Sequence, residues 1–218
     1  MKFKPGFFAL TTAAIVTITF SINSIAAAIQ FTDISNLSSK DKIVSLQERG
    51  VVKGDGKGLF APNNLITAAE GIQFIVNAFG LNIDNIRFIK EPMATDYFPN
   101  AKNDAWYSNT LIIAAMNGLD LPKDLKPQQL WTREEFTYYL IKVMEKVGDL
   151  PMIKLVPAEI SDQDKLSAQY QGAVQRAIVY KVVKLDEKGR FNPKEKVKRS
   201  EAAEAVYNVL EYLSAHKK

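Results

Sequence analysis

The sequence predicts an all-α protein made of three copies of one helix–turn–helix unit, and three observations support this. First, sliding the chain by 131 residues places Val51-Val52-Lys53 on Val182-Val183-Lys184 without a gap. Second, a copy lies between these two, in which Thr132–Glu135 matches Thr67–Glu70 at a shift of 65 residues. Third, apolar residues recur at helical spacing in the second half of each copy. Because one helix pair cannot bury its own apolar face, we expect the three copies to pack together.

Each copy is predicted to consist of a short helix, a turn and a longer helix. In the first copy, Ile43 and Leu46 lie on the apolar face of the short helix, and Gly50 ends it, as glycine often does. The second helix begins at Thr67, which forms a capping box with Glu70. The three expected units cover residues 29–90, 91–155 and 156–218.

Residues 1–28 are predicted to be a signal peptide, so we expect secretion through the Sec pathway. Lys2 and Lys4 form a basic start, residues 7–25 are largely apolar, and Ala26-Ala27-Ala28 offers a cleavage site. A retained membrane anchor is the alternative, but the apolar stretch is shorter than the ~20 residues of a spanning helix. No later stretch is long and apolar enough to span a membrane.

Composition and charge argue against several classes of function. Removing residues 1–28 leaves 26 basic and 24 acidic residues, a net charge of +2, which is too small to indicate nucleic-acid binding. The chain has no cysteine, and its one histidine, His216, lies close to the C-terminus. No histidine cluster for zinc, nucleophile elbow or phosphate-binding loop occurs. We therefore expect a non-enzymatic protein without a cofactor or metal.

The copies resemble the S-layer homology repeat over nearly all of the chain that follows the signal peptide. The family pattern begins with a Phe-x-Asp element, continues through a Phe-x-Pro turn and ends in a Thr-Arg-Ala-Glu element that opens a helix. Phe31-Thr32-Asp33 and Ile160-Ser161-Asp162 match the first element, and Phe98-Pro99-Asn100 stands at the corresponding place in the middle copy. The turn element is Phe60-Ala61-Pro62 and Phe191-Asn192-Pro193. The helix-opening element reads Thr67-Ala68-Ala69-Glu70, Thr132-Arg133-Glu134-Glu135 and Lys198-Arg199-Ser200-Glu201.

The resemblance implies a pseudo-three-fold assembly of helical repeats that binds a secondary cell-wall polysaccharide, often one bearing pyruvate ketals, in grooves between repeats. It also implies non-covalent attachment to the wall of a Gram-positive-type bacterium. The alternative is a wall-associated accessory scaffold that recruits a protein partner through degenerate repeats. An enzyme acting on a wall polymer is the rival from another class. We expect no nucleic-acid partner, and no membrane partner after signal cleavage.

Arg133 and Arg199 are the principal candidates for binding the polysaccharide. A cation in the first turn of a helix opposes the macrodipole, at a cost of up to ~1 kcal/mol. A helix N-terminus with free N–H groups and an arginine fork is instead suited to a carboxylate or phosphate. Replacing either arginine is therefore expected to weaken binding without lowering stability. Ala68 replaces the arginine in the first copy, so that pocket is expected to lack its anion clamp, and Glu134 either neutralises Arg133 or favours the helix end.

Five further residues complete the predicted polysaccharide-binding set, namely Trp106, Asp33, Asp162, Lys53 and Lys184. Trp106 matches the family's tryptophan in the first helix, and it either stacks on a sugar ring or fills a groove. Asp33 and Asp162 complete the first family element in their copies. Lys53 and Lys184 recur after Val-Val, and they either line a groove or are simply solvated.

Overall fold

The computed structural model describes residues 30–150 and 156–216, and these residues form seven α-helices, one 3-10 helix and no strand. The all-α prediction is confirmed, whereas the predicted signal peptide and its cleavage site lie outside the described residues. In chain order the helices are α1 (Lys40–Glu48), α2 (Ala68–Ala78), α3 (Ala94–Tyr97), α4 (Ser108–Met116), α5 (Arg133–Gly148), η1 (Gln163–Lys165), α6 (Ala168–Val179) and α7 (Arg199–Ala215).

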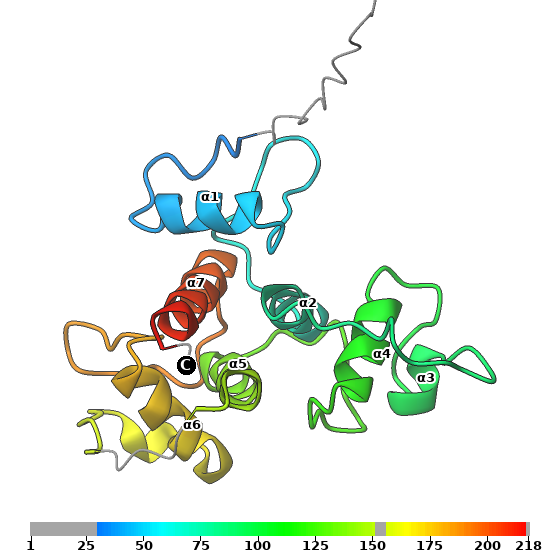
Figure 1. Ribbon diagram of the computed structural model, residues 1–218. Helices are drawn as coiled ribbons and strands as arrows, with labels where there is room; N and C mark the ends of the chain where they lie inside the picture. Colours follow the sequence, from blue (N-terminus) through cyan, green and yellow to red (C-terminus); the bar gives the residue numbers. More distant parts are fainter. Residues whose placement is uncertain (1–29, 151–155, 217–218) are drawn as a thin grey trace, which may run out of the picture.

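Three inner helices, α2, α5 and α7, contact one another at the centre of the molecule, one from each predicted copy (Figure 1). Three backbone hydrogen bonds, each 3.1 Å long, join the segments that lead into them in a cycle. The amide of Ile66 donates to Val197, that of Val197 to Trp131, and that of Trp131 to Ile66. The three copies therefore meet at equivalent points, while a pseudo-three-fold symmetry of the whole chain stays a prediction.

Three outer helices, α1, α4 and α6, interlock the copies, because each packs against the inner helix of a different copy. Helix α1 packs on α7, α4 on α2 and α6 on α5 (Figure 1). Ion pairs accompany two of these contacts: Lys42 of α1 pairs with Glu204 of α7 at 2.7 Å, and Arg176 of α6 pairs with Glu145 of α5. Each copy thus buries its apolar face on its neighbours, which is the packing that a repeat of this size requires.

The capping boxes predicted from the sequence are present. Thr67 Oγ1 accepts from the Glu70 amide at 3.3 Å, and Glu70 Oε2 accepts from the Thr67 amide at 2.8 Å. Thr132 and Glu135 form the same pair at the start of α5. In α7 a lysine replaces the threonine, so only the Glu201 half of the box remains. One glutamate carboxylate therefore lies at the start of each inner helix.

Candidate functional site

The first two backbone amides of each inner helix are bonded to a turn of another copy. In α5, the Arg133 amide donates to Glu195 O at 2.9 Å and the Glu134 amide donates to Pro193 O at 3.2 Å. The first two amides of α2 and α7 make the equivalent bonds. The expectation that free N–H groups would receive an anion here is wrong at these positions, because turn carbonyls already occupy them.

Arg199 lies in a closed socket formed by the first copy. Its Nε donates to Phe60 O at 2.9 Å, and its Nη2 donates to Lys53 O at 2.6 Å. The guanidinium lies 4.9 Å from the ring centroids of both Phe60 and Phe74, and 3.9 Å from Glu70 Oε1. Burial lowers the pKa of Arg199, and the nearby Glu70 carboxylate acts in the opposite direction. Two carbonyls and two rings therefore surround the guanidinium, so this arginine mainly holds two copies together.

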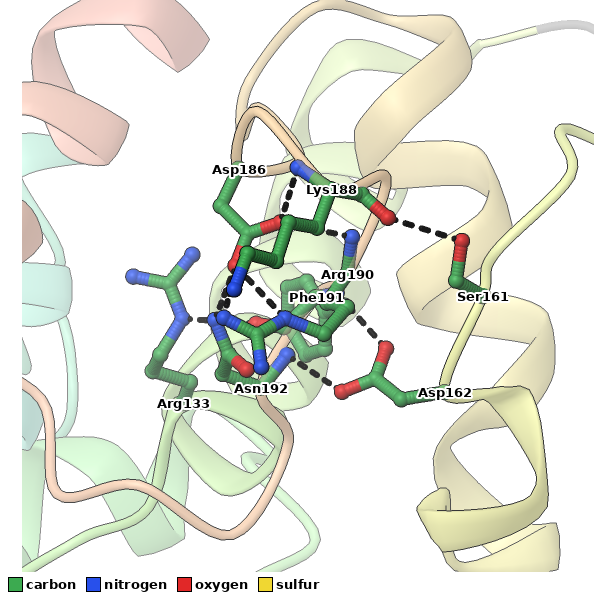
Figure 2. A network of polar contacts seen from close by, with 8 residues as sticks. All are labelled: Arg133, Ser161, Asp162, Asp186, Lys188, Arg190, Phe191 and Asn192. Atoms are coloured by element: carbon green, nitrogen blue, oxygen red, sulfur yellow. Dashed lines mark hydrogen bonds and ion pairs between the residues drawn. The ribbon is translucent and has the colours of Figure 1, made fainter.

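Arg133 occupies the equivalent position in α5 but is held by fewer groups. Its Nε donates to Phe191 O at 3.0 Å, and its guanidinium lies 5.2 Å from the Phe191 ring. Its Nη1 lies 3.2 Å from Glu201 Oε1. Among the described residues, none accepts a hydrogen bond from Nη2, and Figure 2 marks no contact from either terminal nitrogen to the residues of the turn. Arg133 therefore keeps one terminal nitrogen, Nη2, for a ligand, although its side chain is only 18% exposed, against 15% for Arg199.

A groove of about 270 Å³ lies where Arg133 meets the third copy. It brings together two of the predicted binding residues, Arg133 and the exposed Lys184. Three of its acidic side chains are already paired with cations, and Lys184 forms no ion pair within the described ranges. The groove therefore has an unpaired ammonium beside a partly open guanidinium. Its charged lining residues are Arg133, Lys184, Arg190, Asp186, Glu195, Glu201 and Glu204.

The wall of the groove is a turn that a single carboxylate holds in shape (Figure 2). Asp186 Oδ1 accepts from the amides of Lys188 and Arg190, both at 2.9 Å. Its Oδ2 accepts from Arg190 Nε at 2.9 Å and from Asn192 Nδ2 at 3.1 Å. The Arg190 side chain, followed by the backbone and Asn192 hydrogen bonds, keeps the pKa of Asp186 far below its usual value. The carboxylate therefore stays ionised at neutral pH and keeps the turn ordered.

The predicted aspartates bind the turns of their own copies. Asp33 Oδ1 accepts from the Phe60 amide at 2.9 Å, and Asp33 Oδ2 accepts from the Ala61 amide at 2.7 Å. Asp162, which is buried, makes the equivalent pair of bonds at 2.8 and 2.9 Å. Both carboxylates therefore support the turns of their own copies, and a contact of Asp33 or Asp162 with a ligand stays a prediction.

Trp106 and Lys53 lie apart from this groove. Trp106 is 56% exposed, just before α4, and packs edge-on against Tyr107 with ring centroids 5.5 Å apart. The suggestion that it fills a groove is wrong for that reason, and stacking on a sugar ring stays a prediction. Lys53 has an exposed side chain, while its carbonyl oxygen accepts from Arg199.

Glu134 has a role that the sequence did not predict. The residue is only 3% exposed, and its carboxylate accepts from the Ser167 amide at 3.0 Å, from Ser167 Oγ at 2.9 Å and from Lys194 Nζ at 2.5 Å. Ser167 immediately precedes α6, so Glu134 joins the starts of α5 and α6 instead of neutralising Arg133. Ser167 and Lys194 lie 33 and 60 residues from Glu134 in the sequence, so a local sequence pattern could not indicate these contacts.

Across residues 30–150 and 156–216, no group of three or more His, Cys, Asp or Glu side chains could hold a metal ion. Over those same ranges, no helix has both the length and the apolar character needed to cross a bilayer.

The family model of the S-layer homology domain matches residues 30–70 and 159–203, in the first and third copies. The chain is 26% identical over 222 residues to a surface-layer 125 kDa protein of Lysinibacillus sphaericus, covering 98% of this chain and 18% of that protein. It is 26% identical over 186 residues to an exoglucanase of Acetivibrio thermocellus, covering 84% of this chain and 16% of that protein. An amylopullulanase of Thermoanaerobacterium thermosulfurigenes is 27% identical over 183 residues, which cover 83% of this chain and 9% of that protein. The chain thus spans less than a fifth of each relative's length.

Proposed function

We propose that the chain is a member of the S-layer homology domain family, whose model matches residues 30–70 and 159–203, and that it attaches itself non-covalently to a bacterial cell wall by binding an anionic secondary cell-wall polysaccharide. The family match and the likeness to a surface-layer protein support a place at the cell wall. The carboxylate of a substituent such as a pyruvate ketal is the group that we expect the protein to bind. We further propose that the chain binds this polymer without cleaving it.

The groove at Arg133 is the observation that carries this proposal. One end of the guanidinium is fixed by Phe191, so less conformational freedom is lost when the other end binds a ligand. A guanidinium fork binds a carboxylate through two parallel hydrogen bonds, and Lys184 adds a second positive charge to the same groove. A single carboxylate on a sugar ring matches this pair of groups.

Glu201 competes for the same guanidinium, and its exposure decides whether a ligand can replace it. The Glu201 side chain is 41% exposed, and exposed ion pairs contribute only about 0–1 kcal/mol. A ligand carboxylate that also makes sugar contacts can therefore displace it. Because other acidic side chains line the groove, the bound anion should be a compact group beside Arg133 and Lys184.

Sedimentation with purified wall sacculi tests the proposal. The chain from Ile29 onward is mixed with sacculi before and after extraction of the attached polysaccharide, and the bound fraction is measured. We expect binding to intact sacculi and its loss after extraction. A third sample, treated with mild acid to remove ketal-linked carboxylates, should bind more weakly than the intact sacculi. Equal binding to all three samples would show that the polysaccharide is not the ligand.

A further inference from the structure

Position 68 breaks a pattern that the other two inner helices share. Arg133 and Arg199 each donate from Nε to the carbonyl of a turn phenylalanine in another copy. Ala68 is the first residue of α2, as the two arginines are of α5 and α7. Its amide donates to the turn of the middle copy at 2.8 Å, and the amides of the two arginines make the equivalent bonds at 2.9 and 2.8 Å. The middle copy therefore meets a methyl group where the other turns meet a guanidinium.

The groups that surround an arginine in the other sockets have counterparts around Ala68. A pocket of about 210 Å³ opens there, and Leu125, Glu135 and Tyr139 line it. In the repeat alignment, Leu125 and Tyr139 correspond to Phe60 and Phe74, both of which flank Arg199. Trp131 and Tyr170 complete an aromatic wall.

Glu135 lacks the cation that its counterparts have. Its Oε2 accepts from the amide and the hydroxyl of Thr132, both at 2.7 Å. Glu70 and Glu201, at the same position of α2 and α7, each lie near an arginine, at 3.9 and 3.2 Å. Within the described ranges, no arginine or lysine pairs with Glu135. The Glu135 carboxylate therefore has capacity for a positive charge.

The pocket is suited to a cation because neither of its acidic side chains forms an ion pair within the described ranges. Its charged lining consists of Asp124 and Glu135 against Lys126 alone. Tyr139 stacks on Trp131 with ring centroids 5.2 Å apart, and aromatic faces attract cations. Burial raises the pKa of Tyr139, and the negative charge of Glu135 adds to this effect, so the hydroxyl stays protonated at neutral pH.

We propose that the pocket at Ala68 binds the guanidinium group of an arginine side chain from a partner protein. The chain fills the two equivalent sockets with its own arginines, and the Glu135 carboxylate and aromatic rings here offer the same chemistry. The pocket, of about 210 Å³, has room for one side-chain head group. This inference concerns a different pocket from the groove at Arg133 and does not depend on polysaccharide binding.

Ethylguanidinium is the probe for this pocket, and neutral ethylurea is its control of similar shape. Binding is followed by shifts of backbone amide signals in the heteronuclear NMR spectrum of the chain from Ile29 onward. We expect saturable shifts around Ala68, Leu125 and Glu135, with a Kd in the ~1 mM range. Ethylurea should bind at least about tenfold more weakly, because it carries no charge to pair with Glu135. Absent shifts, or equal shifts from both probes, would overturn the proposal.

Two variants and one matched control tie the binding to the pocket. Ala68→Arg supplies the guanidinium from within the chain and should abolish probe binding. Glu135→Gln keeps an oxygen acceptor for Thr132 but removes the charge, and should weaken binding at least about fivefold. Glu48→Gln makes the same chemical change on an exposed residue of α1 and should have no effect. Circular dichroism checks folding, and retained binding in folded Ala68→Arg would place the probe elsewhere and refute the site.

The source of the guanidinium is tested with two further ligands. A blocked tripeptide with a central arginine should bind at least as tightly as ethylguanidinium, and its lysine analogue should bind more weakly. Failure of the arginine peptide to bind would exclude a partner protein's side chain. Tighter binding of glucosamine than of the arginine peptide would reassign the pocket to an amino sugar.

Discussion

Arg199 is enclosed by two phenylalanine rings and two backbone carbonyls, whereas Arg133 has only one of each. The missing ring has a simple origin. Phe74 of α2 packs against Arg199, while its counterpart in α7 is Ala205, which lines the groove beside Arg133. One small residue thus coincides with an open groove, so the same motif position can serve structure in one copy and binding in another.

The largest effect is expected where the closed socket is emptied. Phe74 is a buried side chain, and Phe74→Ala should lower the free energy of unfolding by about 3–5 kcal/mol. Urea denaturation followed by circular dichroism measures this loss. Ala205→Gly, at the counterpart position in α7, should cost only about 1 kcal/mol. Equal losses for both variants would show that the two sockets are not packed differently.

Replacing the two arginines should also reduce stability unequally, with the larger loss at Arg199. Arg199→Gln removes two charge-assisted bonds to carbonyls and should cost about 2–3 kcal/mol of stability. Arg133→Gln removes one such bond and should cost about 1 kcal/mol. These contacts revise the expectation that either arginine could be replaced without loss of stability. Unfolding curves for the two variants that superimpose would contradict the distinction.

Glu134 and Ser200, the residues that follow the two arginines, should also contribute unequally to stability. Glu134 is buried and joins α5 to Ser167 before α6, so Glu134→Ala should destabilise the fold by about 2 kcal/mol. Ser200 holds the same position in α7, and Ser200→Ala should change stability by less than about 0.5 kcal/mol. Thermal melts of both variants measure the difference. A neutral Glu134→Ala variant would mean that the contact with Ser167 adds nothing.

The turns that receive the arginines should show the smallest effect. Ala61 has a φ of 59° and Asn192 has a φ of 57°, both in the left-handed region. Asparagine tolerates this region better than alanine does. Ala61→Asn should therefore raise the free energy of unfolding by about 0.5–1 kcal/mol, and Asn192→Ala should lower it. A loss of stability in Ala61→Asn, measured by urea denaturation, would contradict this reading of the turn.

The sequence was sufficient for features that depend on neighbouring residues. The capping box of Thr67 and Glu70 and the helix-ending Gly50, with a φ of 70°, are where the pattern predicted them. The roles of the arginines could not be predicted in the same way, because their partners belong to other copies. Arg199 bonds to Phe60 across 139 residues, and Arg133 bonds to Phe191 across 58. The motif alone therefore could not distinguish the closed socket from the open groove.

Binding calorimetry with extracted wall polysaccharide tests the central claim most directly. Arg133→Gln should weaken binding about 10- to 150-fold, which corresponds to the ~1.5–3 kcal/mol of a lost charge-assisted contact. Arg199→Gln should bind with nearly the affinity of the parent per folded molecule, even though it is the less stable variant. Parent-like affinity of Arg133→Gln, or an equal loss in both variants, would contradict the assignment of the groove at Arg133 as the polysaccharide site.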